Sequence, residues 1–222
     1  IFSLTDITTA FISEQVEAQR PFFVQLSHYS VHIWHDSMAS TREKYRALPR
    51  PMKAMDSDYF SESEISLSAY KHNWLLNYEA MVDDTDRAFG DLLDHLKALG
   101  IEENTYVIFT SDNGPWKLSG GRGGSALPLK GAKFSTYEGG HRVPCVMWWP
   151  GTIPASTDSA EILTTLDFLP TFASLAGAGF PKDRILDGKD ITSLLKAGSD
   201  GVSEYEKFFY WSKKNITALR MG

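Results

Sequence analysis

The feature that most constrains the fold is a short apolar run, residues 106–110, that ends directly in a polar cluster. The run reads Tyr-Val-Ile-Phe-Thr, and its β-branched and aromatic side chains predict a buried strand. A second apolar run, residues 22–26, also passes into polar residues, and helical patterns precede and follow both runs. Strands that alternate with helices predict an α/β fold with a mainly parallel sheet flanked by helices.

The remaining elements follow from periodicity and from glycine and proline positions. Apolar residues recur at helical spacing from near Ser63 to Leu99, and Gly100 is placed to cap that helix. Gly90, inside the same pattern, indicates close packing. Other predicted elements are a helix capped by Thr5 and Asp6 that ends near Glu17, a long irregular connection over 37–63, a strand over 143–149, a helix over 165–176, and a small hairpin over 207–211 and 216–220.

Composition excludes several classes of protein. The 222 residues carry a net charge of −6 without a dense Lys/Arg stripe, which argues against a nucleic-acid-binding protein. An anionic substrate is still compatible, because a few local cations can outweigh the global sign. No apolar run is long enough for a membrane-spanning helix. Cys145 is the single cysteine, so the chain has no intrachain disulfide.

Polar residues follow both of the first two predicted strands. The run 22–26 leads into three histidines, and the run 106–110 leads into Asp112 and Asn113. Ligands of open α/β sheets bind outside the carboxyl ends of the strands, so we expect the two clusters to share one site. The histidines are His28, His32 and His35.

These residue types allow two readings each. Asp112 and Asn113 offer the oxygen ligands that Ca²⁺ or Mg²⁺ prefers, but Asp-Asn-Gly-Pro is also an ordinary turn sequence. Because calcium takes about six to eight ligands, the rest of a metal shell would come from elsewhere. Lys130 and Lys133 follow a glycine-rich stretch and are either oxyanion-binding or solvated lysines. The histidines are candidates for a general acid or are structural.

Three segments in order, PFFVQLSHYSVH, YVIFTSDNGPW and PLKGAKFSTYEGGHRVPCVMWWPG, resemble the sulfatase family of the alkaline-phosphatase-like superfamily. The third is the most specific, because Lys-Gly-x-Lys, Glu-Gly-Gly and Arg-Val-Pro occur together. TTLDFLPTFASLAGA and LDGKDITSLL resemble the segments that follow in the family. The resemblance implies that residues 1–180 form the C-terminal part of the sulfatase α/β domain. Residues 181–222 would begin a small C-terminal subdomain with an antiparallel sheet.

The resemblance also implies roles for individual residues. Asp112 and Asn113 match the family's metal-binding pair, usually with Ca²⁺ and less often with Mg²⁺. Lys133 matches the lysine that contacts the sulfate, and His32 matches the histidine that contacts the ester and assists the leaving group. Residues expected at the substrate are His28, Trp34, His35 and Trp116, with Trp34 or Trp116 stacking on a ring; Glu138 and Arg142 are expected to anchor the loop as an ion pair.

The chain departs from the family pattern at two places. Ile33-Trp34 follows His32 where the family usually has a small residue and proline. The family's nucleophile resembles a hydrated formylglycine made within a Cys/Ser-x-Pro-x-Arg motif, and these 222 residues do not contain that motif. We therefore expect the C-terminal part of a sulfatase, an incomplete α/β domain that is inactive without the N-terminal part of the same polypeptide.

The resemblance sets the expected partners and the competing functions. The substrate would be a sulfated small molecule or a sulfated glycan, and the full-length protein would be secreted, periplasmic or lysosomal. One alternative is a phosphodiesterase or phosphonate hydrolase of the same superfamily, which would use two transition metals. Another alternative is a non-catalytic sulfatase homologue.

Overall fold

The computed structural model describes residues 1–32, 35–48, 68–116, 124–181 and 183–221. For residues 68–75 it describes the backbone alone. The described residues form two compact units, which we describe separately. Unit 1 comprises Ile1–Glu102 and Asp112–Val143, and unit 2 comprises Glu103–Ser111 and Pro144–Gly222. The division predicted at residue 180 remains a prediction.

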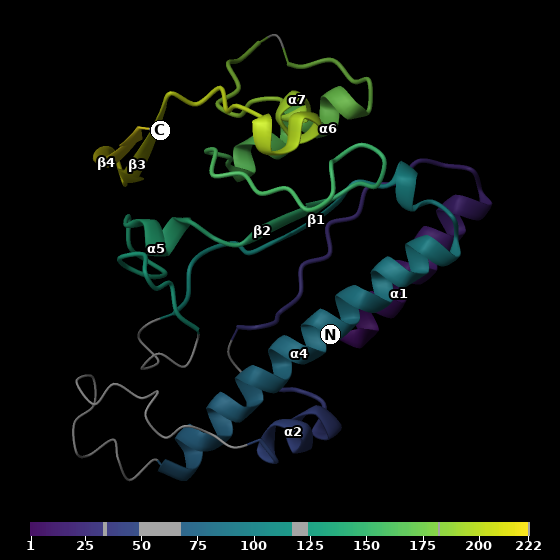
Figure 1. Ribbon diagram of the computed structural model, residues 1–222, viewed down its shortest axis with the longest axis vertical. Coiled ribbons are helices and arrows are strands. Elements are labelled where there is room, and N and C mark those ends of the chain that lie inside the picture. The colour runs from purple at the N-terminus through teal and green to yellow at the C-terminus, as the bar shows by residue number, and fades with distance from the viewer. Residues whose placement is uncertain (33–34, 49–67, 117–123, 182, 222) are drawn as a thin grey trace. The chain divides into compact units, whose positions relative to one another are not determined.

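Unit 1 is built around one long helix, α4 (Ser68–Ala98), against which α1 (Phe2–Glu17) packs (Figure 1). The Ser13 hydroxyl lies 2.9 Å from His95 Nε2 and joins the two helices. Helix α1 begins at Phe2, so the predicted cap at Thr5 and Asp6 is wrong. Thr5 is instead buried inside the first turn, because packing rather than capping determines its environment. The buried apolar side chains of these two helices are Ile12, Leu76, Ala80, Met81, Ala88 and Leu96.

A short helix, α2 (Ala39–Arg46), also packs against α4, within a region predicted to be irregular. The buried Asp84 carboxylate accepts hydrogen bonds from Thr41 Oγ1 at 2.6 Å and from the Met38 backbone N–H at 2.7 Å. Lys44 forms an ion pair with the neighbouring Asp83. The helix is therefore stabilised by polar contacts to α4.

Two glycine predictions for α4 have different outcomes. Gly100 has φ +65° and ends the helix, and the next backbone N–H, of Ile101, donates to the Leu96 carbonyl at 3.1 Å, so the predicted cap is confirmed. Gly90 does not mark close packing, because nothing lies within 4 Å of the position that its Cβ would occupy.

The predicted strand over residues 22–26 is unpaired within the part of the chain that the structure describes. Exposed and half-buried residues nonetheless alternate from Pro21 to Ser30, with the even-numbered residues more buried. The segment is thus extended with one sheltered face, and His28 lies on that face.

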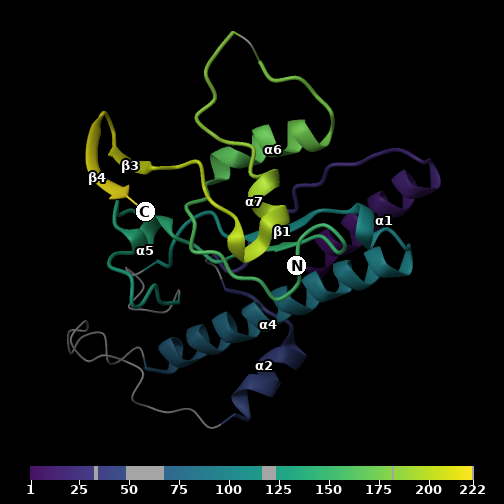
Figure 2. The same cartoon turned by 45° about the horizontal axis from the view of Figure 1, so that its top comes forward.

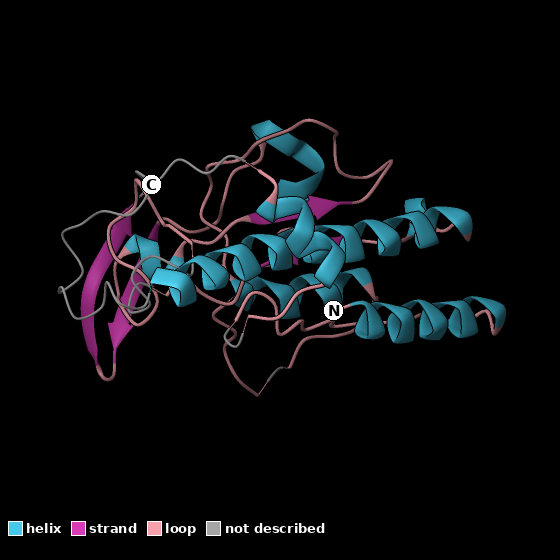
Figure 3. Ribbon diagram, turned by 90° about the horizontal axis from the view of Figure 1, so that it is seen from below, coloured by secondary structure: helices cyan, strands magenta, loops and turns pink. Residues whose placement is uncertain are grey.

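Unit 2 contains two separate strand pairs, both antiparallel (Figure 3). Strand β1 (Val107–Thr110) pairs with β2 (Cys145–Trp148), with Ile108 opposite Met147. The described residues therefore contain antiparallel pairs where the sequence predicted a mainly parallel sheet, because β2 returns along β1. Strand β3 (Lys207–Ser212) pairs with β4 (Asn215–Met221) and confirms the predicted hairpin.

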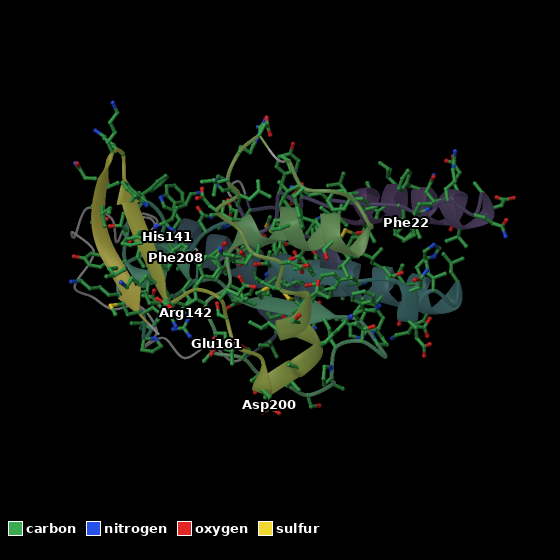
Figure 4. The ribbon with its side chains drawn as sticks, turned by 90° about the horizontal axis from the view of Figure 1, so that it is seen from above. Phe22, His141, Arg142, Glu161, Asp200 and Phe208 are labelled. Atoms are coloured by element: carbon green, nitrogen blue, oxygen red, sulfur yellow. The ribbon has the colours of Figure 1, made fainter. Side chains whose placement is uncertain are left out.

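Helices α6 (Phe168–Leu175) and α7 (Thr192–Ala197) complete unit 2 (Figure 2). The Asp167 carboxylate is fully buried next to α6 and links three segments of unit 2. It accepts hydrogen bonds from the backbone N–H groups of Thr164 at 2.7 Å and Lys189 at 2.8 Å, and from the Tyr205 hydroxyl. Phe208 of β3, which Figure 4 labels, packs edge-on against the Tyr205 ring. Short helical turns are η3 (Glu102–Asn104), α5 (Glu138–His141, in unit 1), η5 (Thr165–Asp167) and η6 (Gly198–Asp200).

Candidate active site

Backbone hydrogen bonds in unit 1 bring two distant segments of the chain together. We call residues 112–116 the site loop and residues 130–140 the lysine turn. The Gly114 N–H donates to the Gly140 carbonyl at 3.0 Å, and the Lys133 N–H donates to the Pro115 carbonyl at 2.9 Å. The structure therefore places the Asp112-Asn113 pair and Lys133 on neighbouring, mutually bonded backbones.

Glycines make this approach possible, because a Cβ would occupy space that another backbone fills. A Cβ on Gly114 would lie 1.8 Å from the Gly139 carbonyl oxygen, and one on Gly139 would lie 2.5 Å from the Gly131 oxygen. A Cβ on Gly140 would lie 2.3 Å from the Ser135 oxygen. The Glu-Gly-Gly sequence is thus a requirement of the backbone packing that fixes the lysine turn against the site loop.

Asp112 and Asn113 lie side by side, and the Asn113 amide donates to Asp112 Oδ1. Asp112 is exposed, so its carboxylate is accessible to a cation. A carboxylate and an amide oxygen are ligands that suit Ca²⁺ or Mg²⁺. Across the described residues, no group of three His, Cys, Asp or Glu side chains is arranged to hold a metal ion. The donor set fits a hard cation, and it is a partial set.

Tyr78 of α4 lies next to the histidine segment and near Gly124. The rings of His35 and Tyr78 meet edge to face, with their centres 5.2 Å apart. The position of a Cβ on Gly124 would lie 2.9 Å from the Tyr78 hydroxyl and 3.7 Å from Pro115 Cβ. Gly124 is therefore close to both Tyr78 and Pro115 of the site loop, and Tyr78 lies beside His35. Sequence reasoning did not identify Tyr78.

The three histidines differ in their surroundings. Burial lowers the pKa of His35, and the neighbouring His32 lowers it further by charge. Burial also lowers the pKa of His28, whose Nδ1 is enclosed without a hydrogen-bond partner among the described residues. His32 is exposed, on a turn closed by its own N–H donating to the Tyr29 carbonyl at 2.8 Å. His32 is thus the most accessible of the three, and its approach to the substrate stays a prediction.

Two lysines of the lysine turn lie against aromatic rings. Lys133 Nζ lies 5.5 Å from the centre of the Phe134 ring, and Lys130 Nζ lies 4.2 Å from that of Tyr137. Both distances fall within the range of a cation–π contact. Phe134, an aromatic residue directly after the candidate lysine, is a further residue that sequence reasoning missed.

The predicted loop anchor and the two tryptophans have separate outcomes. Glu138 and Arg142 form the expected ion pair at 3.5 Å across α5, where Figure 4 labels Arg142. Trp116 of the site loop is half-buried, and its indole nitrogen is enclosed. Trp34 lies outside the described residues, so the predicted stacking on Trp34 or Trp116 remains a prediction.

Known proteins resemble this chain throughout its length. The family model described as Sulfatase matches residues 2–178. An arylsulfatase of Hemicentrotus pulcherrimus is 38% identical over 168 residues, 76% of this chain and 29% of that protein. The N-acetylgalactosamine-6-sulfatase of Canis lupus familiaris is 33% identical over 213 residues, 96% of this chain and 35% of that protein.

Solved structures agree with these matches. The PsFucS1 sulfatase from Pseudoalteromonas sp. superposes with a TM-score of 0.78 at 29% identity, over 98% of this chain and 38% of that chain. Ps i-CgsB in complex with k-i-k-neocarrahexaose gives a TM-score of 0.69 at 30% identity, over 89% of this chain and 39% of that chain.

The protein that these residues define is therefore an α/β protein with the fold of the solved sulfatases. The chain belongs to the sulfatase family. Its fold class is confirmed by the solved sulfatases. The chain spans about a third of the length of the curated relatives described above.

Proposed function

We propose that the full-length polypeptide hydrolyses sulfate esters and that this chain supplies one side of the active site. The observation that carries the proposal is the pair of backbone hydrogen bonds that holds Asp112-Asn113 against the turn bearing Lys133. Membership of the sulfatase family supports sulfate over phosphate esters. Lys133 offers a positive charge to an anionic sulfate group, and Asp112 with Asn113 offers oxygen ligands to a cation.

The proposed roles follow from where charge develops. Cleavage of a sulfate ester builds negative charge on the leaving oxygen and leaves the sulfuryl oxygens anionic. The Lys133 ammonium group binds a sulfuryl oxygen by charge and by N–H donation. His32 is the proposed general acid, which gives a proton to the leaving oxygen.

Asp112 and Asn113 would hold a Ca²⁺ ion, with Mg²⁺ the less favoured metal. A cation held there would supply Lewis-acid polarisation of the sulfuryl group. The nucleophile would be a formylglycine from the N-terminal part of the same polypeptide, since these 222 residues contain no Cys/Ser-x-Pro-x-Arg sequence. On this proposal the 222-residue chain alone is inactive.

The substrate class we propose is a sulfated small molecule or a sulfated glycan. An oligosaccharide is bound in the structure of the relative Ps i-CgsB, which supports a glycan. His28, His35 and Trp116 would line the substrate side of the site. We further propose a secreted, periplasmic or lysosomal location for the full-length protein. None of the helices in the described residues is long and apolar enough to cross a membrane.

The test is an assay of the polypeptide expressed from the complete gene, with 4-nitrophenyl sulfate and with 4-nitrophenyl phosphate. We expect sulfate ester hydrolysis that stops after treatment with a chelator and returns with Ca²⁺. Asp112→Ala should weaken the calcium dependence and the activity together. Preferential hydrolysis of the phosphate ester, or full activity of Asp112→Ala, would reject the proposed site.

A further inference from the structure

Phe134 is the more exposed of two exposed aromatic residues in the lysine turn, and its backbone conformation is uncommon. Phe134 is 82% exposed and has φ +73°. A bulky residue at positive φ is a backbone outlier, and such conformations persist where the surrounding structure holds them in place. An exposed aromatic ring also gives up the hydrophobic stabilisation that its burial would provide. Backbone strain and an exposed apolar ring at the same residue indicate that the Phe134 ring has a function at the surface.

The surrounding turn explains how the conformation is held. The Ser135 hydroxyl donates to the Ala132 carbonyl at 2.7 Å and accepts from the Ala132 N–H at 3.1 Å, so a closed turn surrounds residues 133 and 134. On the far side of the turn Gly139 packs against backbone, since a Cβ there would lie 2.5 Å from the Gly131 carbonyl oxygen. The hydrogen-bonded turn that carries Lys133 therefore holds Phe134 with its side chain exposed to solvent.

The neighbouring lysine indicates what the ring would contact. Lys133 Nζ lies 5.5 Å from the centre of the Phe134 ring. A sulfate group bound at Lys133 would have its ester oxygen, and the group attached to it, within reach of this ring. Trp116 is less exposed than Phe134, and its indole nitrogen is enclosed. Tyr137 of the same turn is 51% exposed and lies against Lys130, so Phe134 is the more exposed ring and the one that lies against Lys133.

We propose that Phe134 is a specificity-determining residue, whose ring stacks on a flat or ring-shaped group attached to the ester oxygen of the substrate. The inference rests on the proposed sulfatase function and on Lys133 as the sulfate-binding residue. An aryl ring and the apolar face of a sugar ring share the chemistry required, because each offers a flat carbon surface to an aromatic ring. The contact adds affinity for the leaving group and leaves the sulfate contacts unchanged.

The experiment compares Phe134→Gly with wild type in the polypeptide from the complete gene. Glycine adopts positive φ without strain, so this variant keeps the turn and removes the ring. The KM for 4-nitrophenyl sulfate should rise about threefold to tenfold, the usual size of an aromatic contact. The inhibition constant of inorganic sulfate, which has no leaving group, should stay within about twofold. A second arm with galactose 6-sulfate tells whether a sugar ring uses the same surface.

The control is Ile185→Ala, which removes a 95% exposed apolar side chain from unit 2 and should leave both constants unchanged. An unchanged KM in Phe134→Gly for both esters would overturn the proposal. So would an equal rise in KM and in the sulfate inhibition constant, because Phe134 would then merely position Lys133. If the polypeptide hydrolyses no sulfate ester, the proposed function fails. The dissociation constant of 4-nitrophenyl sulfate is then measured in place of KM: a rise of about threefold to tenfold in Phe134→Gly supports the stacking contact, and an unchanged constant overturns it.

Discussion

The contact between the site loop and the lysine turn predicts a large effect for a single methyl group at Gly114. In Gly114→Ala the new Cβ would lie 1.8 Å from the Gly139 carbonyl oxygen, whereas real Cβ contacts are no shorter than 3.0 Å. The two backbones must therefore separate by more than an ångström. This movement also breaks the hydrogen bond from the Gly114 N–H to the Gly140 carbonyl.

The consequence for activity follows from the position of the moving segment. Gly114 directly follows Asp112 and Asn113, so the proposed metal ligands move relative to Lys133. A displacement of about 1 Å at reacting groups costs about 100-fold in rate. Overpacking and the lost hydrogen bond together cost about 3 kcal/mol of stability. We expect kcat/KM for 4-nitrophenyl sulfate to fall about 100-fold and the melting temperature to drop.

Gly90→Ala is the matched control for this substitution. Nothing lies within 4 Å of its Cβ position, and alanine favours a helix over glycine by about 1 kcal/mol. This variant should melt at the wild-type temperature or above and keep full activity. The reasoning is refuted if Gly114→Ala keeps wild-type kcat/KM and melting temperature, or if Gly90→Ala is impaired to the same extent.

Three further predictions concern single side chains. Lys133→Ala should lower kcat/KM at least about 100-fold, with weak recovery in Lys133→Arg because the fork of arginine differs in geometry from an ammonium; activity of Lys133→Ala within threefold of wild type would exclude the proposed role. His32→Ala should slow the hydrolysis of a sulfated sugar about 100-fold and that of 4-nitrophenyl sulfate much less, since nitrophenolate leaves without a proton. An equal loss of rate on both esters would contradict general-acid catalysis by His32. Burial and the hydrogen bond to Asp167 raise the pKa of Tyr205 from 10 to about 12. The unfolded chain therefore loses the Tyr205 proton at lower pH than the folded chain does. The stability that the protonated Tyr205 contributes is complete below pH 10 and is lost between pH 10 and about 12. Alkaline denaturation should therefore show a smaller loss over this range in Tyr205→Phe than in wild type, and identical slopes would contradict the assignment.

Local patterns predicted the elements whose stability is local. The long apolar period identified α4, and Gly100 marked its end because a left-handed residue suits glycine. The polar helix α2 has no apolar stripe to reveal it. Its contacts to Asp83 and Asp84 come from residues about forty positions away, and no local pattern encodes them.

The candidate site divides in the same way. Asp112, Asn113 and Lys133 were identified because their residue types and order carry a resemblance, and the structure sets their backbones together. Tyr78 lies beside His35 and close to Gly124, residues from separate parts of unit 1, so no sequence spacing predicts its place. The importance of Phe134 depends on exposure and on a backbone angle, which a residue type alone does not reveal.

The packing of the lysine turn also suggests where an engineer should introduce diversity. Substitution of Gly114, Gly139 or Gly140 collides with main-chain atoms, so a mutant library that varies these positions would consist largely of misfolded members. Position 134 lies in the same turn, yet its side chain is 82% exposed, and the contact that a substitution alters is the one with Lys133. A library confined to residue 134, with the glycines held fixed, would sample changes in substrate preference while leaving the architecture of the turn intact.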